Sequence, residues 1–538
     1  MAPSLSYFEM TPPSCAYSLL SSVDSTVMVV TAVPICMWSA AVVAGTVMSS
    51  SPLGVLSLKA SFKEMTTGRS SRLNVLDVFR VLAILWVMMN HTGSEGRIDI
   101  LDRLPSAQEF KKAVHEHWLF GALLGNSALG VEVFLLLSGL LAARSWLKAS
   151  QSPFCDHYFK YVSRRVFRLF PSVGLFVYIA AGPIMRAVLP RFHNTMISSC
   201  GASGIVSHIT FLGNWQDTPT CLGYLWYIGL DMQLHMVAPL FLHALSCRAR
   251  VAVPLVVIVI FVSAALRAAY CITYGVCNKS DVDIPFISYA GMDVNEMKSV
   301  YLGLWEMYAR PYTKCGPFLI GLLFGWASAS WEQRGYRISN RLVYAIAFHH
   351  ECLFLRLGMT LFISGTLLAI LTIYGILPEY WYPEMTTNVY NVTYTAFFRS
   401  VFAVALVLMI TGLTQRVQLF TVNGVWSILA RLTFSAYLVH MPVVYIFNHL
   451  DYLQQSNSAI TLVIVLPMVA AVSFAFATPF YLFVESPIGR LVSSWDAYVK
   501  RNSASSSITS TSPKVSLEGG LLSDVHDHDN LLPLCEKR

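Results

Sequence analysis

Long apolar runs separated by short polar stretches make up most of the chain between residues 27 and 483. A run of about 20 apolar residues is long enough to cross the hydrocarbon core of a bilayer as a helix. The runs are continuous and do not alternate with period two, which argues against a transmembrane β-barrel. About eleven spans are predicted, near residues 27–48, 73–91, 128–147, 172–190, 224–244, 252–274, 312–330, 357–377, 394–414, 430–449 and 459–483.

This pattern predicts an all-α, polytopic membrane protein with one N-terminal transmembrane helix and a core of ten more. Residues 1–24 form a short N-terminal segment, and residues 25–58 hold the first span and its flank. The core covers residues 72–490. Residues 502–538 are rich in Ser and then acidic, which is typical of a disordered tail, here on the cytosolic side.

The composition supports this fold class: 55% of the residues are hydrophobic and only 12% are charged, unlike a soluble globular chain. The formal net charge of +7 requires no nucleic-acid partner, because Lys and Arg gather in the cytoplasmic loops of membrane proteins. The partner expected from composition is the lipid bilayer. The 11 cysteines form no C-x-x-C pair, so no metal site is predicted.

Charges flanking the spans predict the sidedness of the protein. Asp24 precedes the first span, and Lys59 and Lys63 follow it, which favours an N-terminus outside the cytosol. The predicted outer loops at 378–393 and 450–458 contain no Lys or Arg. Whether the first span is retained or cleaved stays open.

The predicted outer loops carry two further kinds of candidate site. Asn278 and Asn391 begin N-x-Ser/Thr sequons and are candidates for glycosylation. Cys200 and Cys221 share one outer loop and are candidates for a disulfide; the alternative is a pair of free thiols.

The span near residues 72–93 carries three titratable side chains, Asp77, Arg80 and His91. Ionisable groups at membrane depth are costly and usually mark a functional interior. Arg80 and His91 share one helix face about 16 Å apart, and Asp77 is close enough to pair with Arg80. The alternative is a structural Asp77–Arg80 ion pair with His91 as an interfacial polar residue.

Four segments together resemble the acyltransferase-3 family of integral membrane acyltransferases. They are Arg80 followed by His91, Gly130-Val-Glu132-Val-Phe-Leu-Leu-Leu-Ser138-Gly139, Arg164-Arg165-Val-Phe-Arg168-Leu-Phe-Pro171, and Val484-Glu485-Ser-Pro487.

Three more segments resemble the animal branch related to the nose-resistant-to-fluoxetine proteins. They are Leu225-Trp-Tyr227-Ile-Gly-Leu-Asp231-Met-Gln233, Arg310-Pro-Tyr-Thr-Lys-Cys-Gly316-Pro317 and Phe434-Ser-Ala-Tyr437-Leu-Val-His440-Met-Pro442. Full-length members of that branch carry a Cys-rich outer domain before the first helix. About 24 residues precede the first span here, so we expect that domain to be absent, as in the short nematode members.

The resemblance implies transfer of an acyl group from acyl-coenzyme A to a hydroxyl of a lipid, sugar or small molecule, with no permanently bound cofactor. A histidine is the natural base for this chemistry. We therefore expect His91 as the base and Arg80 as its electrostatic partner. Arg164, Arg165 and Arg168 are the candidate contacts for the donor phosphates; the alternative for these three is anchoring on the cytosolic side.

Other polar residues inside apolar spans are candidates for the substrate cavity. Asp231 and Gln233 either line that cavity or join helices. For Ser138, the favoured role is a hydrogen bond that joins two helices. His440 is either a second base or a packing residue. The complete set of cavity candidates is Asp77, Glu132, Ser138, Tyr227, Asp231, Gln233, His440 and Glu485.

Two other function classes remain open. A transporter would use the same buried charges for substrate or proton passage, and a catalytically silent regulator would use the fold as a scaffold. The expected location is the endoplasmic reticulum or another endomembrane rather than the plasma membrane.

Overall fold

A computed structural model describes residues 25–48, 50–67, 74–93, 116–148, 153–197, 200–216, 221–277, 294–333, 351–414, 424–448, 450 and 459–508. The described part of the chain is helical and contains no strand. This arrangement follows from the apolar runs, because a helix satisfies all of its backbone hydrogen bonds without water. The expected all-α fold class is confirmed.

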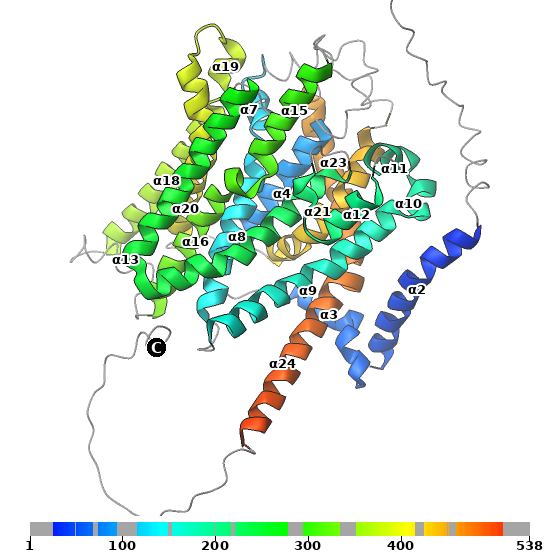
Figure 1. Ribbon diagram of the computed structural model, residues 1–538. Coiled ribbons are helices and arrows are strands. Elements are labelled where there is room, and N and C mark those ends of the chain that lie inside the picture. Colours follow the sequence, from blue (N-terminus) through cyan, green and yellow to red (C-terminus); the bar gives the residue numbers. More distant parts are fainter. Residues whose placement is uncertain are drawn as a thin grey trace, which may run out of the picture.

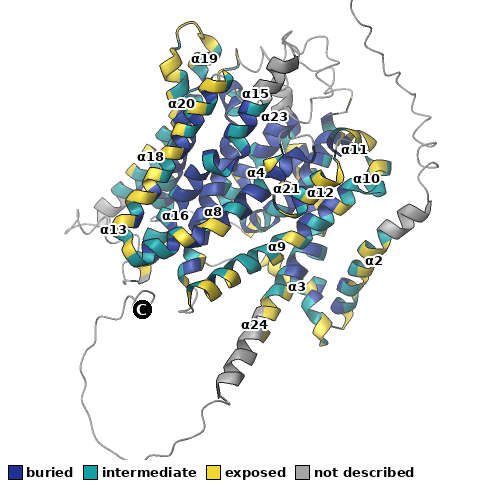
Figure 2. Cartoon of the chain, in the orientation of Figure 1, coloured by how far each residue is buried: buried dark blue, intermediate teal, exposed yellow. Residues whose placement is uncertain are grey.

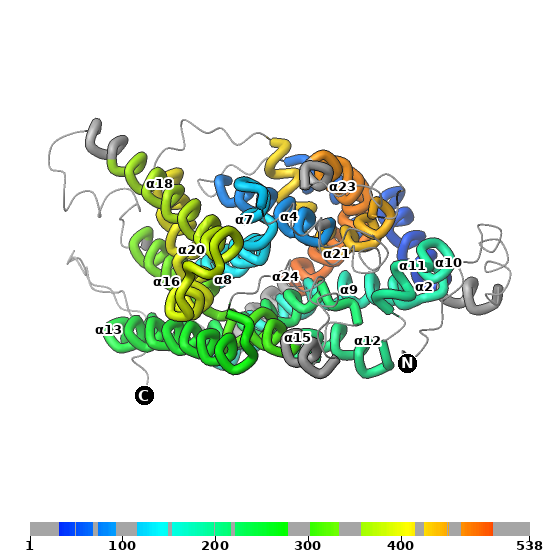
Figure 3. The backbone as a smooth tube through the Cα atoms, turned by 90° about the horizontal axis from the view of Figure 1, so that it is seen from above, coloured from blue at the N-terminus to red at the C-terminus, as the bar shows by residue number. Residues whose placement is uncertain are grey.

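The long helices form a bundle with a central group surrounded by outer helices (Figure 1). The central helices are α4 (Val75–Gly93), α8 (Leu129–Lys148), α16 (Pro311–Gln333) and α21 (Gly424–Asn448). Around them lie α9 (Phe154–Ala181), α13 (Trp226–Tyr274), α18 (Glu351–Tyr374), α20 (Asn388–Thr414) and α23 (Ala459–Phe480). Seen from above, α18, α20 and the second half of α13 lie on one side, and α23 and α2 (Ser25–Val47) on the other (Figure 3).

Short helices complete the chain at the ends of the bundle. They are η1 (Pro52–Leu56), α3 (Leu58–Thr66), α7 (Phe120–Gly125), α10 (Pro183–Val188), α11 (Pro190–Met196), α12 (Ala202–Ile209), η4 (Gly213–Trp215), η5 (Gly223–Leu225), α15 (Val294–Ala309), α19 (Leu377–Trp381) and η7 (Tyr481–Glu485). We call the end of the bundle that carries α7 and α19 the α19 end. The opposite end, where α13 bends at Arg248, is the Arg248 end.

The residues of the central helices are mostly buried (dark blue in Figure 2), and exposed residues (yellow) lie mainly on the outer helices. Among the described residues, seven helices are long and apolar enough to cross a membrane, or eight if α2 and α3 form one bent span. One of the seven, Gly223–Tyr274, holds two predicted spans, because Arg248 leaves the helical region of backbone conformation between them. A multi-pass membrane protein is thus confirmed, while the number eleven stays a prediction.

Two predicted boundaries differ from the structure. The span expected at 172–190 is broken, because α9 ends at Ala181 and Pro183 opens α10 after an extended Gly182. The residue before a proline avoids the helical region, which explains the break. Helix α24 (Ser486–Ile508) extends away from the bundle and continues seven residues into the segment expected to be disordered (Figure 1). Residues 509–538 and the N-terminal segment 1–24 lie outside the described residues.

Candidate active site

Two histidines from distant parts of the chain meet inside the bundle. His91 lies near the end of α4, and His440 lies within α21. The Nδ1 atom of His91 is 2.7 Å from the Nε2 atom of His440, and the two rings are stacked. Both side chains are buried, His440 completely. The structure therefore joins the predicted base to the second histidine that the sequence singles out.

The hydrogen bonds around this pair assign its protons. The Nδ1 atom of His440 lies 2.7 Å from the backbone carbonyl oxygen of Tyr437, which can only accept a hydrogen bond. In the neutral ring, Nδ1 of His440 is therefore the donor, and its Nε2 carries the lone pair. That lone pair accepts the proton on Nδ1 of His91, which leaves the basic lone pair of His91 on Nε2.

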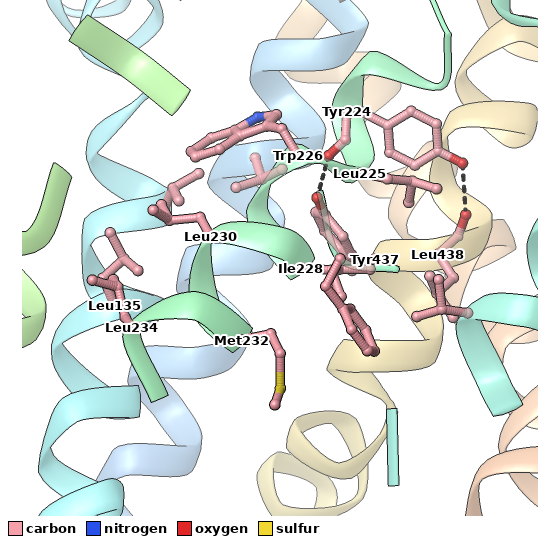
Figure 4. Close-up of a cluster of buried hydrophobic side chains, with 14 of the residues drawn as sticks. Leu135, Tyr224, Leu225, Trp226, Ile228, Leu230, Met232, Leu234, Tyr437 and Leu438 are labelled. Carbon is pink, nitrogen blue, oxygen red and sulfur yellow. Dashed lines mark hydrogen bonds between the residues drawn. The ribbon is translucent and has the colours of Figure 1, made fainter. Parts of the chain in front are cut away.

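Tyrosines surround the histidine pair. Tyr224 has its ring centre 5.5 Å from that of His440 and 6.4 Å from that of His91. Tyr224 and Tyr437 also join η5 to α21: Tyr437 donates a hydrogen bond to the carbonyl of Tyr224, and Tyr224 donates to the carbonyl of Leu438 at 3.1 Å (Figure 4). These mutual bonds fix the aromatic walls around the imidazoles.

The loop before Tyr224 is itself held in place. Cys200 and Cys221 are bonded in a disulfide, the pairing predicted for that loop. Burial lowers the pKa of His208, and its neutral ring donates from Nε2 to the carbonyl of Cys221 at 2.6 Å. Leu222 adopts a left-handed conformation, with φ of 44°, and its side chain is fully buried. Such a conformation persists in a leucine only where the surroundings impose it, so this segment is built to a fixed shape.

A cluster of charges lies further along α13, toward the Arg248 end. Asp231 accepts hydrogen bonds from Ser138 at 2.5 Å and from Arg165, and His235 lies 3.5 Å away. Tyr227 lies one turn before Asp231 and is close enough to interact electrostatically with both Asp231 and Arg165. Arg165 therefore forms an ion pair with Asp231, whereas the sequence predicts that it contacts the phosphates of the donor.

These residues form a continuous series through the bundle. We call them the polar column: His91, His440, Tyr224, Tyr437, Tyr227, Asp231 and Arg165. One end of the column lies near the end of α4 and the other in the basic first half of α9.

Arg80 and Asp77 lie on α4, about three and four turns before His91. Asp77 is 3.6 Å from the Arg80 guanidinium and accepts a hydrogen bond from Ser427 on α21 at 3.2 Å. Arg80 also lies within electrostatic reach of Tyr227 in the polar column. The expected Asp77–Arg80 pair is present, and it faces the column.

The other candidates divide between different places. Gln233 bonds Asn214, Trp215 and the carbonyl of Phe211, which is the helix-joining alternative. Glu485 accepts from Ser435 at 2.6 Å and lies within electrostatic reach of the exposed Arg168.

Glu132 lies apart from the polar column. It is fully buried and ion-paired with Lys314 at 2.6 Å and with Arg399 at 3.5 Å. The predicted cavity set is therefore not one cavity: Glu132, Gln233 and Glu485 each have polar partners outside the polar column.

Of the two candidate glycosylation sites, only Asn391 lies in the described part of the chain. Asn278 lies outside the described residues. The side-chain nitrogen of Asn391, the atom that would carry a glycan, donates to Glu379 at 2.9 Å. Among the described residues, no group of three or more potential metal ligands is gathered.

Sequence reasoning missed Tyr224, Lys314, Arg267 and Arg399 as site residues. For the three cations a signal existed: each lies inside a predicted apolar span, where a charged side chain is costly and needs a partner. For Tyr224 no local signal existed, because an aromatic residue in a span is most often part of the packing.

The chain matches the acyltransferase-3 profile, described as "Acyltransferase domain", over residues 73–481. It is 54% identical over 462 residues to the regulator of hypoxia-inducible factor 1 of Caenorhabditis elegans, covering 86% of this chain and 88% of that protein.

A second relative is more distant. The nose resistant to fluoxetine protein 6 of Caenorhabditis elegans is 24% identical over 418 residues, covering 70% of this chain and 45% of that protein. No solved structure matches the chain. The family profile covers the helices that build the polar column, and the resemblance seen in the motifs is confirmed: the chain belongs to the acyltransferase-3 family of membrane proteins.

Proposed function

We propose that this protein is a membrane-bound O-acyltransferase that moves an acyl group from acyl-coenzyme A to a hydroxyl group of a lipid, sugar or small molecule. The observation that carries the proposal is the hydrogen-bonded pair of buried histidines, His91 and His440, within an acyltransferase-3 domain. A base oriented by a second group is the arrangement that activates a weak nucleophile.

In the proposed reaction, the acceptor hydroxyl attacks the thioester carbonyl while Nε2 of His91 takes its proton. The new ester C–O bond forms, and the C–S bond breaks. The coenzyme A thiolate leaves and recovers the proton from His91. His440 does not touch the reacting atoms in this scheme; it is a positioning residue that holds the lone pair of His91 on Nε2.

The polar column supports entry of the donor from the Arg248 end. That end carries Arg164, Arg165 and Arg168 on α9, and guanidinium groups suit phosphate. Because Arg165 is paired with Asp231, we assign the phosphate contacts first to Arg164 and Arg168. A cytosolic Arg248 end and an endomembrane location are parts of this proposal.

Arg80 has a more limited role than the sequence suggests. It lies eleven residues before His91 on one helix, which separates the two by about 16 Å. At that distance a single carbonyl carbon does not contact both side chains. Arg80 is therefore proposed to orient the donor rather than to stabilise the oxyanion at the carbonyl that His91 serves.

A second candidate function rests on one of the comparisons. The relative that is 54% identical is named as a regulator. In this alternative, the histidine pair is a structural contact between α4 and α21, and the protein acts without acyl transfer.

One measurement separates the two functions. Coenzyme A release from acetyl- and longer acyl-coenzyme A is followed with purified wild-type protein and with the His91→Ala variant. We expect a loss of about 10²- to 10⁴-fold, the contribution of a general base. The control is His193→Ala on α11, a histidine outside the polar column, which should retain activity.

The variants are compared only at equal folded fractions. Release that persists in His91→Ala would remove the base role. Absence of both release and acyl-coenzyme A binding in the wild type would favour the regulator.

A further inference from the structure

A second polar site lies at the α19 end, outside the polar column. It is a cavity of about 50 Å³ between α7, α13, α15, α19 and α20, and none of its lining residues belongs to the column. A bound water needs roughly 10–15 Å³ on this measure. The cavity therefore has room for a group of a few non-hydrogen atoms.

Two buried guanidinium groups line this cavity, those of Arg267 on α13 and Arg399 on α20. The exposed fraction is 0% for Arg267 and 6% for Arg399. Arg267 donates to the carbonyl of Ala396, one helical turn before Arg399, so both groups meet at the same stretch of α20. Guanidinium groups stay charged at neutral pH.

The contacts of these arginines leave positive charge uncompensated. All three hydrogen bonds of Arg267 within the described residues go to neutral backbone carbonyls. Arg399 donates to the carbonyl of Met307 at 2.8 Å, and its Nε, which has no hydrogen-bond partner there, is 3.5 Å from Glu132. Glu132 is shared with Lys314, so one carboxylate faces two cations directly.

With Glu379, which also lines the cavity, three cations (Arg267, Arg399 and Lys314) share two carboxylates, so the arrangement is costly without a further negative charge. Like charges repel strongly where the effective dielectric constant is low, and a buried charge needs a partner. The cavity provides a place for that partner, because both arginines line it.

We propose that this cavity binds a small monovalent anion between Arg267 and Arg399. The anion is either a free halide or a small carboxylate the size of acetate, which enters the cavity whole. The cavity volume suits either one. Glu379, which also lines the cavity, contributes a negative charge of its own, so it disfavours ions of higher charge.

The site does not depend on the proposed acyl transfer. It is tested without an acyl donor, by the melting temperature of the purified full chain in detergent at constant pH and ionic strength. Sodium gluconate, whose anion is too large for the cavity, is replaced stepwise by sodium chloride or by sodium acetate. An anion that binds only the folded protein raises the melting temperature in a saturable way.

Three variants and one control make the test specific. Arg399→Met is expected to abolish the saturable rise. Arg399→Lys keeps the charge but loses the planar fork, and is expected to weaken binding by about tenfold. Glu379→Gln removes the negative charge in the cavity and is expected to tighten binding. The control is Arg144→Met, which removes a guanidinium paired with Glu332 at the other end of the bundle and should leave the anion response unchanged.

The outcomes are distinct. A rise with chloride alone identifies a free halide, and a rise with acetate identifies a carboxylate. If Arg399→Met fails to fold, Arg399→Lys and Glu379→Gln still shift the response in opposite directions. No saturable response in the wild type, or the same response in the wild type and all variants, would overturn the proposal.

Discussion

At the scale of single residues, the proposed reaction depends on which nitrogen of His91 carries its lone pair. The carbonyl of Tyr437 accepts a hydrogen bond from Nδ1 of His440, so the proton of His440 is on Nδ1. Nε2 of His440 then accepts from Nδ1 of His91, so the proton of His91 is also on Nδ1. In the proposed reaction, the order of these bonds gives His440 the role of fixing the tautomer of His91 rather than that of a second base. A packing residue in the same place would not need this geometry.

The first prediction separates positioning from packing. His440→Ala should lower kcat for coenzyme A release by between about tenfold and 10⁴-fold, the latter being the cost of a misassigned imidazole tautomer. The KM for acyl-coenzyme A should change little, because the proposed donor site lies nearer the Arg248 end.

His440→Gln offers an amide oxygen that accepts the proton on Nδ1 of His91. It should recover part of the lost kcat. Equal losses in both variants at matched folding would speak for a packing role and against positioning.

At the scale of helices, close approach of α8 to α16 places Glu132 beside Lys314. Glycines make this approach possible. A Cβ added at Gly139 would collide with the carbonyl of Phe318, and one added at Gly321 with the carbonyl of Leu136. Gly321 and Gly325 have the four-residue spacing that membrane helices use for close backbone contact.

The second prediction compares two glycine substitutions. Gly321→Ala should destabilise the protein by about 1–3 kcal/mol, because overpacking forces the two backbones apart. Gly174→Ala on α9, where an added Cβ meets nothing within 4 Å, should be neutral or stabilising by up to about 1 kcal/mol, the difference in helix propensity.

Melting temperatures in one detergent provide the measurement. Equal effects of the two substitutions would show that the contact between α8 and α16 is not limiting for stability.

At the scale of the whole molecule, the sidedness of the bundle decides where donor and acceptor meet. The proposed function places the Arg248 end in the cytosol and the α19 end outside it. Two disulfides lie at the two ends of α13, away from its bend at Arg248. Cys200–Cys221 closes the loop before α13, and Cys271–Cys277 lies at its last turn. Disulfides persist in oxidising compartments, which supports this orientation.

The third prediction tests the orientation directly. In sealed microsomes with their cytosolic face outward, a membrane-impermeant maleimide should label exposed Cys155 at the start of α9. A cysteine introduced by Val389→Cys, at a position that is 76% exposed beside α19, should react only after the membrane is permeabilised.

Labelling is read peptide by peptide by mass spectrometry, so that other cysteines do not interfere. The opposite pattern would invert the topology and place the donor phosphates on the wrong side for cytosolic acyl-coenzyme A.

The sequence by itself determined the helical class, the membrane environment, the family and the helix that carries Arg80 and His91. These properties follow from local patterns, because apolar length and the spacing of residues along one helix are read directly from neighbouring positions. It also predicted the Cys200–Cys221 pair, since both cysteines lie in one loop.

Only the tertiary structure decided how the polar residues are combined. His91 meets a partner 349 residues away, and Arg165 pairs with Asp231 instead of remaining open to a ligand. Arg267 and Arg399, read from the sequence as parts of apolar spans, meet around one cavity. No local pattern specifies such meetings, because they depend on which helix faces are packed together, and that is settled by close packing across the whole bundle.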